Sequence, residues 1–117
     1  MFITTTVYSP VLLLPTDRGT KVIPLESIVR IEAMSNYCKL IFSDGKTLVV
    51  ARVLRWFEKT LSAGDFVRIH HKHLVNGRWC RGVSGLQVSL SSGETLPVAR
   101  RRAKVLKEAA GLFSIKQ

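Results

Sequence analysis

The sequence predicts a mainly β fold of small antiparallel sheets, with one short helix near residues 53–62 and a second helix at the C-terminal end. Three observations support this fold class. Apolar and polar residues alternate along several segments, as they do in half-buried strands. The turn signals Asp44-Gly45 and Ser92-Gly93 each separate two such segments. Helical spacing of apolar residues is confined to two stretches.

The N-terminal half is predicted to consist of strands joined by short turns. Its predicted strands are 11–14, 21–23, 29–33, 37–42 and 47–50. The first two flank the sequence TDRG, and residues 25–28 can form one helical turn. The last two flank Ser43-Asp44-Gly45-Lys46. Because Asp-Gly fits the tight turns that join antiparallel strands, we expect a β-hairpin there.

The hydrophobic period changes at Val53. Val53, Leu54, Phe57 and Leu61 repeat at helical spacing, and Gly64 follows as a stop signal. This pattern predicts one short amphipathic helix.

Strands resume after this helix, and the chain ends in a second helix. The predicted strands are 66–70, 86–90 and 95–98, the last two forming a hairpin around Ser92-Gly93. In the first of them, alternation places Val67 and Ile69 on one face and Phe66, Arg68 and His70 on the other. The final helix is predicted from Ala99, Ala103, Leu106 and Ala110, with Gly111 as its C-terminal cap.

Length and composition limit the function classes. The 117 residues fit one domain, 1–117, and 18 Lys and Arg against 8 Asp and Glu give a net charge of +10. An acidic polymer is therefore the first partner class to consider. The longest aliphatic run, 11–14, is too short to span a membrane, and the first residues lack a secretory signal, so we expect no membrane insertion and a cytoplasmic location. Cys38 and Cys80 lack a C-x-x-C pattern and are interpreted as small apolar residues.

Basic residues gather in two clusters. Residues 66–81 contain four Arg or Lys and all three histidines, with no carboxylate, and a solvated face would also explain this cluster alone. The second cluster, Arg100, Arg101, Arg102, Lys104 and Lys107, begins the last helix. Cations oppose the helix dipole at that end, whereas a bound phosphate would compensate for them. The two clusters together favour a function in anion binding over a merely solvated surface.

Other interpretations of these residues are weaker. His71 and His73 have no Cys, Asp or Glu within several residues to complete a metal site, so no metal or cofactor is expected. His70 fits a hydrogen-bonded, half-buried ring as well as a phosphate contact. Asn76, before Gly77, is interpreted as a turn residue rather than a base reader. The eight acids are scattered and no partner for a catalytic histidine can be named, so we do not expect an enzyme.

Three segments in order resemble the LytTR DNA-binding domain over residues 22–106. They are the I-E-A strand before a hairpin, the F-x-R-I-H-x-x-x-L-V-N stretch, and the L-P-V-x-R sequence before the last helix. The resemblance implies an elongated stack of small antiparallel sheets and sequence-specific binding of promoter DNA, with loops inserted into successive major grooves. It also implies paired target repeats, a possible homodimer on DNA and a possible protein regulator. Because few residues precede the match, we expect a stand-alone regulator without a receiver domain.

The resemblance also assigns contact residues. Those implied to contact bases are Asn36, Cys38, His71 and Arg100. Those implied to contact phosphates are Ser35, Tyr37, Lys39, His70, Lys72, Arg101 and Lys104. These roles require the His70–Lys72 and Arg100–Arg102 segments to lie side by side on one electropositive edge.

Two alternatives of other classes remain. A basic β-rich module could grip RNA or single strands by stacking bases on Tyr37, Trp56, Phe66 or Trp79. A protein that has lost DNA binding could instead antagonise a related regulator through protein contacts.

Overall fold

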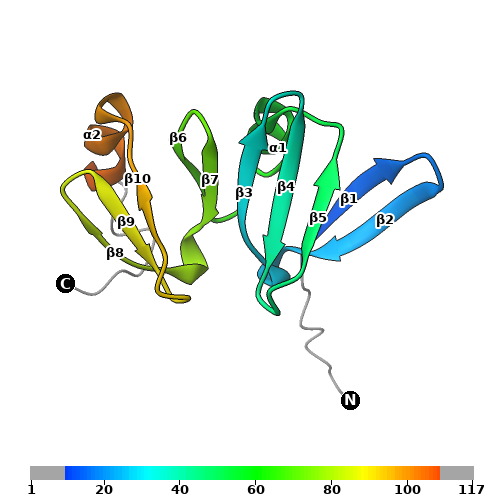
Figure 1. The fold of residues 1–117 in the computed structure, drawn as a ribbon, viewed down its shortest axis with the longest axis horizontal. Helices are drawn as coiled ribbons and strands as arrows, with labels where there is room; N and C mark the ends of the chain where they lie inside the picture. The colour runs from blue at the N-terminus through cyan, green and yellow to red at the C-terminus, as the bar shows by residue number, and fades with distance from the viewer. Residues whose placement is uncertain (1–9, 109–117) are drawn as a thin grey trace, which may run out of the picture.

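The structure, a computed structural model, describes residues 10–108 and consists mainly of three antiparallel sheets set in a row (Figure 1). Within this range the strands are β1 (Val11–Thr16), β2 (Gly19–Pro24), β3 (Ile28–Met34), β4 (Tyr37–Phe42), β5 (Thr47–Val50), β6 (Phe66–His70), β7 (His73–Asn76), β8 (Cys80–Ser84), β9 (Gln87–Leu90) and β10 (Thr95–Pro97). The helices are α1 (Leu54–Thr60) and α2 (Arg100–Glu108), with 3₁₀ turns at Leu25–Ser27 and Gly77–Trp79. The predicted mainly β, elongated fold class is confirmed.

A five-stranded sheet with the order β5-β4-β3-β7-β6 occupies the middle of the row. Strands β1 and β2 form a separate hairpin, and β10, β9 and β8 form a three-stranded sheet. The hairpins predicted around Asp44-Gly45 and Ser92-Gly93 are both present. Gly45 and Gly93 adopt φ values of 88° and 95°, which suit glycine because a side chain is strained there.

The first hydrophobic core lies between one face of the five-stranded sheet, the β1–β2 hairpin and α1. Ile31 and Leu40 contribute from the sheet, Leu12 and Leu14 from the hairpin, and Phe57 from α1. The predicted helix near 53–62 is thus confirmed, with its regular part at 54–60. It forms because its apolar residues share one face, which the sheet buries.

The second core joins the opposite face of β6 and β7 to the three-stranded sheet and α2. Ile69 and Val75 pack with Val88 of β9 and with Leu106 of α2, and Val67 packs against the same cluster. Phe66 belongs to the first core, so the two predicted faces of this strand are confirmed. Strand β6 is therefore covered on both sides, and α2 is fixed against it.

Two strands, β7 and β8, were not predicted from the sequence. Leu74, Val75 and Asn76 are all buried, so β7 has no alternation, and Gly82 follows a register shift in β8. The predicted C-terminal helix is present as α2, whereas Ala110 and Gly111 lie outside the described residues.

Strand direction brings several connections to one edge of the molecule. Because β7 is antiparallel to both β3 and β6, the chain leaves β3 and β6 at the same end of the sheet. The start of α2 lies at that end as well, at the top of Figure 1. We call residues 35–36, 70–72 and 100–104 of this end the basic edge.

Candidate nucleic-acid interface

Two backbone hydrogen bonds join the three segments of the basic edge. The amide of Ala33, just before the β3–β4 turn, donates to the carbonyl oxygen of Lys72 at 2.9 Å. The amide of Ala99, just before α2, donates to the carbonyl oxygen of Ile69 at 2.8 Å. The 70–72 turn is therefore held between the other two segments, although they are far apart in sequence.

Arg68 shapes the 70–72 turn from below. Its Nε donates to the carbonyl oxygen of His70 at 2.8 Å, and one terminal nitrogen donates to that of His71 at 2.6 Å. The other terminal nitrogen donates to Oε1 of Glu58 in α1 at 2.8 Å. Only 13% of the Arg68 side chain is exposed. A guanidinium that caps two carbonyls while paired with a carboxylate fixes the turn in one conformation.

The imidazole rings of the turn are packed together. The rings of His70 and His71 stack with centroids 4.4 Å apart, and His73 lies 5.4 Å from His70. Nδ1 of His70 accepts from the amide of Lys72 at 3.2 Å, which requires that this nitrogen carry no proton. Burial, together with the charges of His71 and Lys72, lowers the pKa of His70, which favours the same neutral ring. His71 and Lys72 themselves are exposed.

The β3–β4 turn places a strained residue at the same edge. Ser35 has a φ of 59°, a value that residues with a side chain rarely adopt. Ser35 and Asn36 are exposed, and half of the Tyr37 surface is exposed where β4 begins. Both side chains of the tight turn, Ser35 and Asn36, are thus available to a partner.

The start of α2 carries the densest charge of the edge. Arg100, Arg101 and Lys104 are exposed, whereas Arg102 is half-buried with a terminal nitrogen 3.8 Å from Oε2 of Glu58. The first turn of α2 contains no acidic residue. Leu106 is buried in the second core, so the helix presents its basic side outward.

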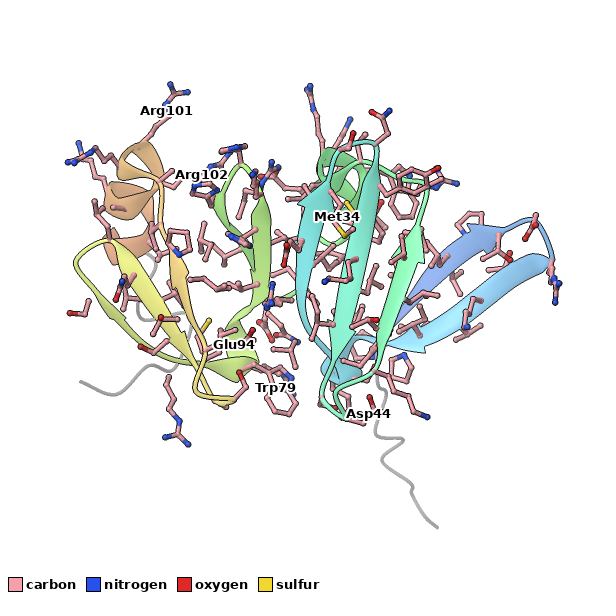
Figure 2. All side chains as sticks on the ribbon, in the orientation of Figure 1. Met34, Asp44, Trp79, Glu94, Arg101 and Arg102 are labelled. Atoms are coloured by element: carbon pink, nitrogen blue, oxygen red, sulfur yellow. The ribbon has the colours of Figure 1, made fainter. Side chains whose placement is uncertain are left out.

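The opposite edge of the molecule, which we call the far edge, includes Asp44, Trp79 and Glu94 and carries acidic side chains. Figure 2 shows Arg101 and Arg102 at the top of the molecule and Asp44, Trp79 and Glu94 at the bottom. Arg78 of the first basic cluster also lies away from the basic edge, at the Gly77–Trp79 turn, where its Nε donates to Oδ2 of Asp65 at 3.0 Å. The first cluster is therefore divided: His70, His71 and Lys72 lie at the basic edge with the arginines of α2, whereas Arg78 lies away from it.

Comparison with known proteins agrees with this geometry. A family model described as the LytTr DNA-binding domain matches residues 18–111, which is most of the chain and includes the whole basic edge. The chain belongs to the LytTR family of DNA-binding domains. The match extends beyond residues 22–106, the range of the resemblance in the sequence.

A solved structure supports the LytTR fold. The LytTr DNA-binding domain of a Bacillus cereus protein described as a methyl-accepting/DNA response regulator superposes with a TM-score of 0.68 at 23% identity. The likeness covers 89% of this chain and 98% of that one. Among curated proteins, none matches this chain.

One residue assigned by the LytTR resemblance is not at the surface. Cys38 is fully buried in the first core beside Leu40, so its side chain cannot reach a base in this structure. The reason is strand parity, because Cys38 and Leu40 face the core while Tyr37 and Lys39 face outward. The interpretation of both cysteines as small apolar residues is confirmed: both are buried free thiols, and burial raises the pKa of each to about 11.

Two further polar residues, Lys39 and Asn76, are not fully exposed. Lys39 is half-buried on the outward face of β4, opposite Glu32 in register. Asn76 is buried, and its side chain donates to the carbonyl oxygen of Ile28 at 2.9 Å and accepts from the amide of Arg78 at 3.0 Å. Asn76 is therefore the turn residue that was predicted.

The sequence did not predict the role of Arg68 and Glu58 in this LytTR domain. Arg68 belongs to the first basic cluster of the sequence, but it is half-buried and paired with Glu58. Its position in the sequence could have indicated this role, because Arg68 comes two residues after Phe66 and so lies on the same face of β6, which α1 covers.

In residues 10–108 no three His, Cys, Asp or Glu side chains are arranged to hold a metal ion. Neither helix in this range has the length and apolar character that a membrane span requires.

Proposed function

We propose that this LytTR domain is a transcriptional regulator that binds specific duplex DNA sequences, with its basic edge inserted into major grooves. The observation that carries the proposal is the union of three distant segments at that edge through the Ala33–Lys72 and Ala99–Ile69 hydrogen bonds. Each segment presents exposed polar or cationic side chains at this edge, and groove recognition requires such groups.

Three exposed residues are proposed to read bases: Asn36, His71 and Arg100. Arg100 is suited to guanine, because its guanidinium can donate two parallel hydrogen bonds to O6 and N7. Asn36 can make the equivalent pair of bonds with adenine. His71 can donate to guanine or accept from adenine, so its preference depends on its protonation. Cys38 is not proposed to read a base, because its side chain is buried.

Seven residues at or next to the basic edge are proposed to contact phosphates. They are Ser35, Tyr37, Lys39, His70, Lys72, Arg101 and Lys104. These contacts would fix the register of the protein on DNA without selecting a sequence. For His70, only the ring nitrogen Nε2 is available, because Nδ1 accepts from the amide of Lys72.

The aromatic residues favour duplex DNA over single strands. Arg52 covers the ring of Trp56 with its guanidinium carbon 4.5 Å from the ring centroid, and Phe66 is buried. Nε1 of Trp79 donates to the carbonyl oxygen of Glu26 at the far edge. Of these four candidate rings, Tyr37 alone is left open at the basic edge, whereas single-strand binding uses several stacking platforms.

Selection of sites from random duplex DNA tests the proposal. We expect one preferred sequence, bound with a strong salt dependence, and weak competition by RNA or single-stranded DNA. Equal affinity for all duplexes, or better competition by RNA, would contradict it.

The same proposal includes the location of the protein, its target sites and its partners. The regulator would act without catalysis, in the cytoplasm, on promoter sites that occur as paired repeats. Two copies would then occupy one site, and a protein regulator could control them. Analytical ultracentrifugation with one-site and two-site duplexes would count the copies bound.

A further inference from the structure

Glu58 is an acid placed where a polyanion is proposed to bind. Its side chain is 38% exposed and belongs to α1. A carboxylate near bound DNA repels phosphate, so its presence needs a structural reason. The reason lies in its two oxygens, because Oε1 accepts from Arg68 at 2.8 Å and Oε2 lies 3.8 Å from a terminal nitrogen of Arg102.

Glu58 and Arg68 thereby connect three separate elements. Arg68 holds the carbonyl oxygens of His70 and His71, and Glu58 holds Arg68 while attracting Arg102 of α2. One carboxylate of α1 thus links the turn to the first turn of α2. The Ala99–Ile69 hydrogen bond joins the same two segments through the backbone.

We propose that Glu58 and Arg68 are a positioning pair that holds the 70–72 turn at a fixed distance from the start of α2. The pair determines sequence specificity without contacting DNA, because it sets how His71 and Arg100 are presented together. This inference rests on the proposed DNA-binding function. Shifts of about 1 Å at a recognition surface are enough to spoil paired contacts, so the rigidity of this link is the quantity that matters.

Arginine is required at position 68 because of the shape of its guanidinium. Its planar group donates in three directions at once, to two carbonyls and to Glu58. A lysine keeps the charge but has a single nitrogen, which cannot span the same three acceptors. Arg68→Lys therefore removes the positioning and retains the electrostatic attraction.

The experiment compares affinity for the selected duplex with affinity for random duplex. For Arg68→Lys we expect unchanged affinity for random DNA and a ratio of the two affinities roughly tenfold lower, as for a small misplacement of recognition groups. For Glu58→Gln we expect slightly tighter binding of random DNA, because a negative charge is removed, and again a lower ratio. The matched control is Arg78→Lys, whose exposed ion pair with Asp65 lies at the far edge.

A second readout does not depend on DNA. The amide of Lys72 donates to His70 and the amide of Ala33 donates to Lys72, so both report the order of the turn by hydrogen exchange. In Arg68→Lys these two amides should exchange faster, while amides in the middle of β4 stay protected. If Arg68→Lys does not fold, Glu58→Gln carries both measurements.

The outcomes separate the two proposals. A protein that selects no duplex sequence contradicts the proposed function, and the amide exchange still decides whether the pair orders the turn. A protein that selects a sequence but keeps its affinity ratio in Arg68→Lys and Glu58→Gln overturns the positioning role. Unchanged exchange at Lys72 and Ala33 in both variants overturns it as well.

Discussion

Replacing Glu94 with glutamine should weaken the link between the five-stranded and three-stranded sheets. Glu94 precedes β10, and its two carboxylate oxygens accept from Nε and a terminal nitrogen of Arg30 in β3 at 3.2 and 2.9 Å. The other terminal nitrogen of Arg30 donates to Glu32 at 2.8 Å. Arg30 therefore joins the sheet that carries the 70–72 turn to the sheet that leads into α2.

The magnitude follows from the burial of this group. The Arg30 side chain is 11% exposed and the Glu94 side chain 42%. Exposed ion pairs contribute about 0–1 kcal/mol, and breaking a buried pair costs about 3–5 kcal/mol. Because the Arg30–Glu94 pair is only partly buried, we expect the cost of breaking it to fall between these two ranges. Glu32 still compensates part of the charge of Arg30. We expect Glu94→Gln to lower the free energy of unfolding by about 1–2 kcal/mol, which lowers Tm by roughly 4–8 °C.

Thermal melting over a range of pH is the assay. The hydrogen bonds from Arg30 lower the pKa of Glu94 below its ordinary value of 4.5. The stabilisation is therefore complete at neutral pH, declines as the pH falls below 4.5 and is lost below the folded-state pKa. The difference between the variant and the unmodified protein should shrink in the same acidic range.

Asp65→Asn is the matched control. It breaks an ion pair of similar length, 3.0 Å to Arg78, whose side chains are 51% and 70% exposed. We expect a loss of about 0.5 kcal/mol or less. Equal losses in the two variants, or a loss in Glu94→Gln that does not change with pH, would refute the reasoning from burial.

Three further outcomes are expected. Arg100→Ala should leave Tm unchanged, since Arg100 is exposed, and should reduce discrimination between selected and random duplexes by about 1–3 kcal/mol in binding titrations. Equal losses on both duplexes would contradict a base-reading role. Lys72→Ala should weaken all duplexes alike and reduce the slope of log affinity against log salt by about one, whereas an unchanged slope would argue against a phosphate contact. Burial lowers the pKa of His70 and His73, so the stability they contribute is complete above their ordinary value of 6.5 and lost as the pH falls through the folded-state values. Melting between about pH 8 and 5 measures this loss, and a constant Tm would contradict it.

The fold was predictable wherever one face of an element is buried. The β4–β5 and β9–β10 hairpins combine alternation with Asp44-Gly45 or Ser92-Gly93, so pattern and turn chemistry agree. Strand β7 could not be predicted in the same way, because both of its faces are covered and Leu74 and Val75 are buried in different cores. A strand between two cores loses the period of two that identifies it.

The candidate site was predictable as a set of segments, but not residue by residue. The resemblance placed a contact loop at 35–38, yet the direction of each side chain depends on register, and a shift of one residue exchanges the two faces. Cys38 therefore faces the core while its neighbour Tyr37 is half exposed. The pair of Arg68 and Glu58 depends on the packing of α1 against β6, which spacing in the sequence does not determine.

The alternating direction of the strands also explains how a chain with +10 net charge keeps two of its carboxylates, Asp44 and Glu94, away from the proposed DNA surface. Hairpin connections fall on either edge of a sheet in turn, so residues near them are separated without long loops. Asp44 and Glu94 lie in connections of the far edge, and Arg101 lies at the basic edge (Figure 2). Such a charge distribution orients the molecule before contact, because a polyanion attracts the basic edge more strongly than the far edge. Reversing the charge of Asp44 with Asp44→Lys should therefore raise affinity for random duplex more than affinity for the selected sequence. An increase in the ratio of selected to random affinity would show that the far edge also takes part in recognition.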